Sequence, residues 1–313
     1  MNTSHSALLV ALLAGSAALA QGQTLLYEFT FDDYANGTAT VSTGQPSRTA
    51  NLIHHPSSGV TNPTNLRGAP GSGVSGSLGD YALDINASQM GGSSNSAGYG
   101  GAASLSNATS VLSGVTSLTI AGWYNANSKP GTYARLIELG ETSLYFQLTG
   151  STYVLQATAG RVGSSGADLN ASRFTSTNNA IFSVTSEWVF FAFTFDGTTG
   201  TGNLYAGTSP ETLVSIGTRT DLAQGAIFLN ANAATTLSIG NSASSAYERP
   251  FDGLIDNIRI WADTSGSASA LSEEALKNVM RNDLGLIPEP SSAAVLAGVA
   301  TLGLAATRRR RAK

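Results

Sequence analysis

Apolar and polar residues alternate over many short stretches of the chain, which predicts β-strands. In residues 25–31 every second side chain from Leu25 to Phe31 is apolar, as expected for a half-buried strand. Similar short runs, separated by turn residues, predict further strands at 81–85, 118–124, 134–139, 144–148, 153–157, 187–195, 203–206, 213–216, 227–229, 236–240 and 254–261.

Residues 187–195 form the most apolar of these segments. They contain Trp188 and four phenylalanines, so side chains on both sides of the strand are apolar. Such a strand is buried on both faces, which predicts a place at the centre of a two-sheet sandwich. It stops at Asp196 and Gly197, a strong turn signal, so Asp196 is interpreted as a turn residue.

Two long segments at 42–80 and 86–116 are rich in Gly and Ser and show little periodicity. We expect long loops there, with a minor strand at 51–53 inside the first.

One helix is predicted, near residues 272–284. Ser272 is the expected N-cap, the two glutamates after it suit the positive end of the helix dipole, and Gly285 can end the helix. Leu276 begins an apolar stripe that a short covering helix would bury.

The first 20 residues are expected to be a secretory signal peptide. Residues 7–20 are almost wholly apolar, and Ala18 and Ala20 supply the small residues that signal peptidase needs before Gln21. The alternative is a buried core helix, which the abrupt polar shift at Gln21 disfavours.

Residues 287–313 carry three features in order: Pro288-Glu289-Pro290, an apolar stretch at 293–306, and the run Arg308, Arg309, Arg310 and Arg311. The arginines are expected to stay cytoplasmic, which leaves the rest of the chain outside. This end resembles the PEP-CTERM sorting signal of Gram-negative bacteria. The resemblance implies a transient inner-membrane anchor, cleavage by an exosortase-type enzyme, and delivery to the cell surface or exopolysaccharide. The alternative is an ordinary membrane anchor with the same topology.

The composition of the chain excludes several classes of function for the part between the signal peptide and the sorting tail. Charged residues make up 12% of the chain, the net charge is −4, and no basic cluster precedes the tail, so nucleic-acid binding is not expected. The chain has no cysteine, which excludes thiol nucleophiles, cysteine-bound zinc and disulfides. Residues 21–286 are long enough for one all-β domain.

Five segments recur in the order known from one family: SLTIAGW at 117–123, EWVFFAFTFDG at 187–197, LYAG at 204–207, LSIG at 237–240 followed by FDGLIDNIRIW at 251–261, and LSEE at 271–274. Over residues 24–283 the chain resembles LamG-like, concanavalin A-like domains. The resemblance implies an all-β, two-sheet antiparallel jelly-roll sandwich with one short C-terminal helix, and carbohydrate or protein ligands. It does not imply one activity, because this fold hosts lectins, glycosidases and lyases.

Catalytic residues are not evident in the sequence. A retaining glycosidase needs two carboxyl groups about 5–5.5 Å apart. Glu138 and Glu141 have opposite parity, so they would face apart on one strand, and the adjacent His54 and His55 would also point apart. We therefore expect an exported, non-enzymatic protein that binds a glycan or matrix component. The alternative is a carbohydrate-active enzyme, a hydrolase or lyase, on the same fold.

One structural calcium ion is the site that the family resemblance implies. The matching positions are Asp32 or Asp33, and Asp256. Alternation places Asp256 on the same side as Ile258 and Ile260, where a carboxylate needs a cation or several N–H donors. The alternative is hydrogen bonding to a neighbouring loop.

The three tryptophans, Trp123, Trp188 and Trp261, lie in alternating strands and are expected in the core. Trp261 is the one expected to be partly exposed.

Overall fold

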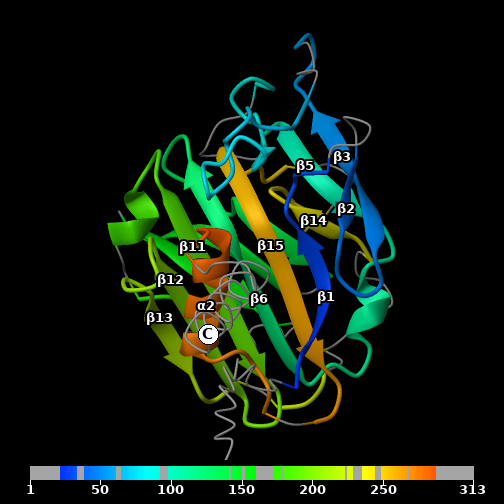
Figure 1. The fold of residues 1–313 in the computed structure, drawn as a ribbon, viewed down its shortest axis with the longest axis vertical. Helices are drawn as coiled ribbons and strands as arrows, with labels where there is room; N and C mark the ends of the chain where they lie inside the picture. The colour runs from blue at the N-terminus through cyan, green and yellow to red at the C-terminus, as the bar shows by residue number, and fades with distance from the viewer. Residues whose placement is uncertain are drawn as a thin grey trace, which may run out of the picture.

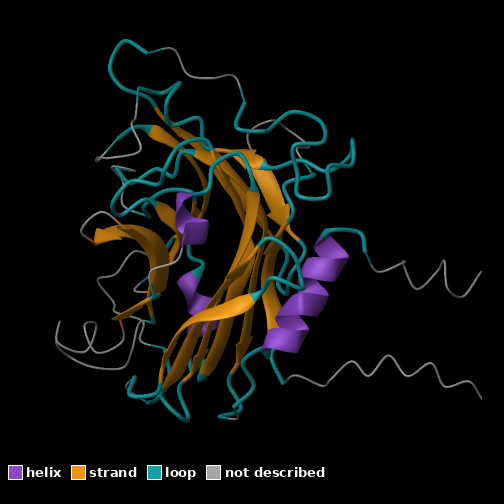
Figure 2. Ribbon diagram, turned by 90° about the vertical axis from the view of Figure 1, so that its left-hand side faces the viewer, coloured by secondary structure: helices purple, strands orange, loops and turns teal. Residues whose placement is uncertain are grey.

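The computed structural model describes residues 22–33, 39–60, 65–91, 98–140, 142–149, 152–159, 173–177, 180–222, 224–227, 235–243, 248–266 and 268–286. In this part of the chain two antiparallel β-sheets pack face to face, and one α-helix lies on the outer side of one sheet (Figures 1 and 2). The predicted all-β sandwich with one C-terminal helix is confirmed. No helix in the described ranges is long and apolar enough to cross a membrane. The signal peptide and the sorting tail lie outside these ranges.

The seven-stranded sheet has the strand order β1-β15-β6-β11-β12-β13, and β4 also pairs with β15. Its strands are β1 (Thr24–Phe29), β4 (Leu83–Asp84), β6 (Ser117–Ala126), β11 (Trp188–Asp196), β12 (Thr201–Gly207), β13 (Val214–Arg219) and β15 (Gly253–Asp263).

The eight-stranded sheet has the order β10-β9-β8-β7-β14-β5-β3-β2. Its strands are β2 (Ala39–Ser42), β3 (Arg48–His55), β5 (Gly100–Leu105), β7 (Arg135–Leu139), β8 (Thr142–Thr149), β9 (Thr152–Thr158), β10 (Arg173–Thr175) and β14 (Leu237–Ile239). Two short 3₁₀ helices, η1 (Thr109–Leu112) and η2 (Ala180–Ser183), lie between strands along the chain.

The main hydrophobic core fills the space between the sheets. Alternate residues of most strands point into it, among them Phe191, Phe193 and Phe195 of β11. Tyr124 of one sheet meets Phe146 of the other edge to face, with ring centroids 5.2 Å apart. Burying one such side chain contributes about 1.5–3 kcal/mol. This explains why apolar alternation could locate strands with large inward side chains, such as β11.

A second, smaller core lies under helix α2 (Glu273–Asp283), on the outer side of the seven-stranded sheet (Figure 2). Phe190 of β11 and Trp123 of β6 meet there edge to face at 5.2 Å, and Met280 packs against the same cluster. The prediction that β11 is buried on both faces is therefore confirmed. Its second face is covered by the helix, because a sandwich strand has only one face toward the other sheet.

Helix α2 begins as predicted. The hydroxyl of Ser272 accepts a hydrogen bond from the Ala275 N–H at 3.3 Å, and Glu273 and Glu274 lie in the first turn. Gly285 follows with φ of +66°, a conformation that suits glycine.

The expected loop at 86–116 is wrong in part, because β5 lies within it. Its sequence, GGAASL, lacks the bulky residues that mark a strand. Neighbouring side chains leave room only for glycine at the first two positions. A Cβ on Gly100 would lie 2.6 Å from Pro250 Cβ, and one on Gly101 would lie 2.5 Å from Leu66 Cδ2. In the expected loop at 42–80, β3 is likewise a full strand of eight residues and extends well beyond the minor strand predicted at 51–53.

The alternation expected for β15 is also wrong at one point. The pairing of β15 with β6 shifts between Asp256 and Arg259, and Asn257 has φ of +50°. This bulge reverses the parity of the strand. Ile258 and Ile260 point into the main core, whereas Asp256 pairs with Trp123, whose side chain lies under the helix.

Candidate functional site

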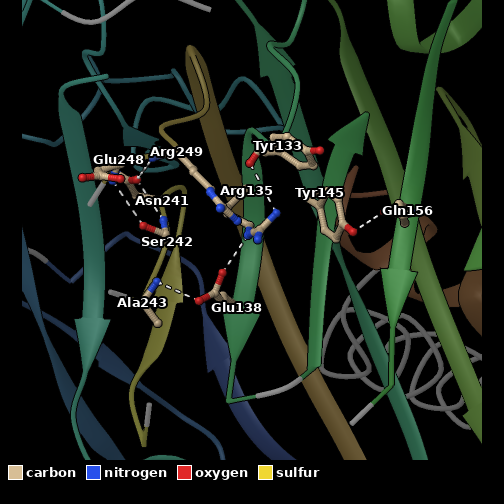
Figure 3. A network of polar contacts seen from close by, with 10 residues as sticks. All are labelled: Tyr133, Arg135, Glu138, Tyr145, Gln156, Asn241, Ser242, Ala243, Glu248 and Arg249. Atoms are coloured by element: carbon tan, nitrogen blue, oxygen red, sulfur yellow. Dashed lines mark hydrogen bonds and ion pairs between the residues drawn. The ribbon is translucent and has the colours of Figure 1, made fainter. Parts of the chain in front are cut away.

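A network of polar and aromatic side chains lies on the outer face of the eight-stranded sheet (Figure 3). The inward side chains of β7, β8 and β9 are apolar, so the alternate residues Glu138, Tyr145 and Gln156 face away from the core. A register shift in β7 between Arg135 and Ile137 turns Arg135 to the same outer face as Glu138.

Arg135 occupies the centre of this network. Its Nε donates to Glu138 Oε2 at 2.6 Å, its Nη1 donates to the Tyr133 carbonyl at 3.4 Å, and its guanidinium lies 4.2 Å from the centroid of the Tyr145 ring. Glu138 Oε1 also accepts from the Ala243 N–H at 3.2 Å. These contacts hold Arg135 rigidly, and they engage both carboxylate oxygens of Glu138.

Two tyrosines form an aromatic pair beside Arg135. The rings of Tyr133 and Tyr145 are 6.1 Å apart, and the Tyr145 hydroxyl donates to Gln156 Oε1. Gln156 Nε2 in turn donates to Thr175 Oγ1 at 2.9 Å. Tyr145 is buried, but Tyr133 is 45% exposed, so its ring is open to a ligand.

The segment after β14 brings a second arginine to the same place. Asn241 Oδ1 accepts from the N–H groups of Ser242 and Arg249, at 2.8 and 2.9 Å. The Arg249 carbonyl accepts from the Arg135 N–H at 3.0 Å. The Arg249 guanidinium consequently lies 5.3 Å from the centroid of the Tyr133 ring.

A cleft of about 180 Å³ opens beside this network. It is lined by Arg135, Glu138, Gly140, Ser143, Tyr145, Thr158 and Arg173. The pKa of Arg135 lies below its ordinary value, mainly because the side chain is buried. The Glu138 carboxylate offsets part of this effect, and the Arg249 cation adds to it. The cleft thus combines an aromatic wall, hydroxyl groups and positive charge.

Among the described residues that line this cleft, Glu138 is the one carboxylate. A glycosidase of the retaining or inverting type uses two. Glu141, the other glutamate considered from the sequence, lies outside the described residues.

A second cleft, of about 400 Å³, lies near the end of α2. Its lining includes Asp32, Asp80, Asn257, Arg259 and Asp283. Asp80 was not predicted from the sequence; its Oδ2 accepts from the Ser75 N–H at 2.6 Å.

The three residues predicted to hold calcium each accept different hydrogen bonds. Asp32 lines the second cleft and accepts from the Tyr81 N–H at 2.9 Å. Asp33 instead accepts from Thr40 Oγ1 and from the Val41 N–H, both at 2.8 Å.

Asp256 is fully buried, and both of its oxygens accept backbone N–H groups, from Val74 at 2.8 Å and from Asn257 at 2.7 Å. These bonds correspond to the alternative of hydrogen bonding to a neighbouring loop. Within the described ranges no group of three or more His, Cys, Asp or Glu residues could hold a metal ion. Calcium binding through Asp256 and either Asp32 or Asp33 stays a prediction.

The prediction for the tryptophans holds for Trp123 and Trp261 but not for Trp188, which is only partly buried. Trp123 is fully buried, and Trp188 and Trp261 are partly buried against the cluster under α2. None of the three belongs to the polar network. The residues of the signal-cleavage and sorting motifs, Ala18 to Gln21 and Pro288 to Arg311, lie outside the described residues.

The sequence reasoning missed the polar network. The strands at 134–139 and 144–148 were predicted, so Tyr145 could have been placed on the outer face beside apolar Leu144 and Phe146. The positions of Arg135 and Arg249 could not have been predicted. A register shift orients Arg135, and a backbone hydrogen bond between residues far apart in the sequence positions Arg249.

The chain matches the concanavalin A-like lectin/glucanases superfamily over residues 97–269, more than half of its length. It therefore belongs to this family, as the sequence resemblance implied. No curated protein matches the chain.

The solved structures to which the chain is similar are distant in sequence. A candidate carbohydrate-binding protein of Bacteroides ovatus is 20% identical, with a TM-score of 0.39, over 53% of this chain and 41% of that one. The binding domain of botulinum neurotoxin DC in complex with SialylT is 10% identical, with a TM-score of 0.45, over 83% and 52%. The CBM40 module of the Ruminococcus gnavus IT-sialidase, bound to α2,3-sialyllactose, is 15% identical, with a TM-score of 0.39, over 55% and 85%. The chain thus spans about half the length of the first two.

Proposed function

We propose that this protein is an exported, non-enzymatic surface protein that binds a carbohydrate on the outer face of its eight-stranded sheet. The observation that carries the proposal is the exposed Tyr133 ring beside the rigid Arg135, Glu138 and Tyr145 cluster. Binding sites for small ligands typically combine an aromatic surface with a few fixed polar groups, and a sugar ring presents one apolar face and several hydroxyls. Membership of a lectin/glucanase superfamily agrees with this proposal.

A binding role is preferred to catalysis because Glu138 is committed to Arg135 and Ala243. A general acid or base must come within hydrogen-bond reach of the reacting oxygen or water. Both carboxylate oxygens of Glu138 are already engaged by these two contacts.

Export and surface display are proposed from the two ends of the sequence. The signal peptide would direct the chain out of the cytoplasm, and the Pro288-Glu289-Pro290 motif would direct an exosortase-type enzyme to deliver it to the cell surface or extracellular matrix. The ligand would then be a glycan of that matrix.

Binding of the purified protein to immobilised polysaccharides of varied composition tests this function. We expect retention on at least one polysaccharide and a loss of about tenfold or more in affinity for Tyr133→Ala, because a sugar would lose its stacking surface. Tyr99→Ala, which removes an exposed tyrosine outside the network, is the control. Release of reducing or unsaturated sugar by the protein would favour the enzyme alternative, and binding unaffected by Tyr133→Ala would place the site elsewhere.

A further inference from the structure

Among the described residues that line the cleft on the eight-stranded sheet, positive charges outnumber negative ones, although the whole chain has a net charge of −4. Two arginines, Arg135 and Arg173, line it against one glutamate, and Arg249 stands beside it. Glu138 neutralises only Arg135, at 2.6 Å.

The other two arginines lack such a partner in the described part of the chain. Arg173 is exposed, and its guanidinium makes no hydrogen bond or ion pair to a described residue. Arg249 is also exposed and contacts the Tyr133 ring rather than a carboxylate. In a protein with 12% charged residues, three arginines around one cleft are a local concentration of charge.

The surroundings of Arg135 favour an incoming anion. Burial and the neighbouring Arg249 cation both disfavour its charge, and Glu138 compensates in part. A ligand with a negative group between these arginines would relieve the repulsion. The Glu138 contact and the Tyr145 ring already fix Arg135, so the ordering of this one side chain would cost little on binding.

We infer that the cleft binds an acidic polysaccharide through the carboxylates of its uronic acid units, which Arg173 and Arg249 contact while a sugar ring stacks on Tyr133. This inference rests on the proposed function and specifies its ligand class. The planar guanidinium forms paired hydrogen bonds with a planar carboxylate, so a carboxylate matches arginine better than a neutral sugar hydroxyl does.

The test uses the full chain, purified in mild detergent, and three probes. Polygalacturonate carries free carboxylates, its fully methyl-esterified form lacks their charge, and dextran sulfate carries sulfate esters on a glucan backbone. Calorimetric titration is expected to show binding to polygalacturonate that weakens as salt rises, and at least tenfold weaker binding to the ester. Arg173→Gln and Arg249→Gln are each expected to weaken polygalacturonate binding about tenfold, as loss of one charge-assisted contact does. Arg281→Gln, on the exposed side of α2, removes the same charge outside the cleft and is expected to change nothing.

Each other outcome overturns a defined part of the proposal. Equal binding of the free acid and the ester would refute carboxylate recognition and leave carbohydrate binding in place. Arginine-dependent binding of dextran sulfate alone would refute the carboxylate in favour of a sulfate ester. Equal losses for Arg281→Gln and Arg173→Gln would show a non-specific charge effect. If no polysaccharide of the binding screen is retained either, the proposed function fails as well.

Discussion

The carboxylate of Asp283, the last residue of α2, accepts a hydrogen bond from the indole Nε1 of Trp123 in β6 at 2.8 Å. The other carboxylate oxygen lies 2.7 Å from Arg259 Nη1 and forms an ion pair with it. Burial alone would lower the pKa of Arg259, but Asp283 and Glu28 more than offset it and raise it. One buried carboxylate thus fastens the helix to the outer face of the sheet.

Replacing this carboxylate should loosen the helix. We expect Asp283→Ala to lower the free energy of unfolding by about 3 kcal/mol, because it leaves the buried Trp123 N–H without an acceptor and Arg259 with Glu28 alone. Urea denaturation measures this loss. The exposed Glu274→Ala on the same helix is the control and should change stability by less than about 0.5 kcal/mol. Equal stability of both variants would contradict the anchoring role.

Two buried tyrosines should respond oppositely to loss of the hydroxyl. The Tyr124 hydroxyl lies in the core without a hydrogen-bond partner in the described residues, whereas the Tyr27 hydroxyl donates to the Ala108 carbonyl at 3.0 Å. Tyr124→Phe should therefore raise the free energy of unfolding by about 1 kcal/mol, and Tyr27→Phe should lower it by about 1 kcal/mol. Parallel denaturant titrations test this, and a loss of stability in Tyr124→Phe would show that its hydroxyl has a partner.

Asp84 should make stability depend on pH. Burial raises its pKa, the Asn86 N–H lowers it, and the nearby Asp252 raises it further. A carboxyl with a raised pKa keeps its proton up to a higher pH in the folded state than in the unfolded state. Its contribution to stability is therefore present below about pH 4 and is lost as pH rises through the folded pKa.

The variant Asp84→Asn removes this ionisation and keeps an oxygen that can accept from Asn86. We expect a smaller loss of stability from pH 4 to pH 7 than in the wild type, measured as the free energy of unfolding at a series of pH values. Asp221→Asn is the control, because the hydrogen bond that Asp221 accepts from Arg219 lowers the pKa of Asp221, so the effect of this group on stability has the opposite sign. A pH profile of Asp84→Asn that overlays the wild type would exclude this role.

The calcium prediction for Asp32, Asp33 and Asp256 has a thermal test. An ion that binds only the folded state stabilises it by about 2.7 kcal/mol at 100 times Kd, so calcium added to EDTA-treated protein should raise Tm by several degrees, and magnesium by much less. Asp256→Asn should abolish the shift. If the wild type shows no shift, or Asp256→Asn keeps all of it, Asp256 serves only to accept the Val74 and Asn257 N–H groups.

The sorting prediction is tested in cells. Pro288→Ala combined with Glu289→Ala should leave the precursor in the inner membrane, because the recognition motif is lost while the apolar segment remains. Fractionation of cells that express tagged wild type and variant measures this. Identical delivery of both to the surface would leave the tail as an ordinary anchor.

Much of the fold could be predicted from the sequence, because burial imposes a period that is visible locally. The apolar face of β1, the doubly apolar β11 and the capped helix at Ser272 each appear within a few consecutive residues. The order of five family segments added the two-sheet arrangement, which local periodicity alone does not contain.

Only the tertiary structure decided the candidate binding site. Glu138 contacts Ala243 across 105 residues of sequence, and Arg135 and Tyr145 converge because β7 pairs with β8 through a register shift. Likewise the bulge at Asn257 turned Asp256 away from the side that alternation predicted. A sequence pattern shows which residues of a strand share a face, but strand partners, bulges and register depend on long-range packing. That packing selects which polar side chains meet.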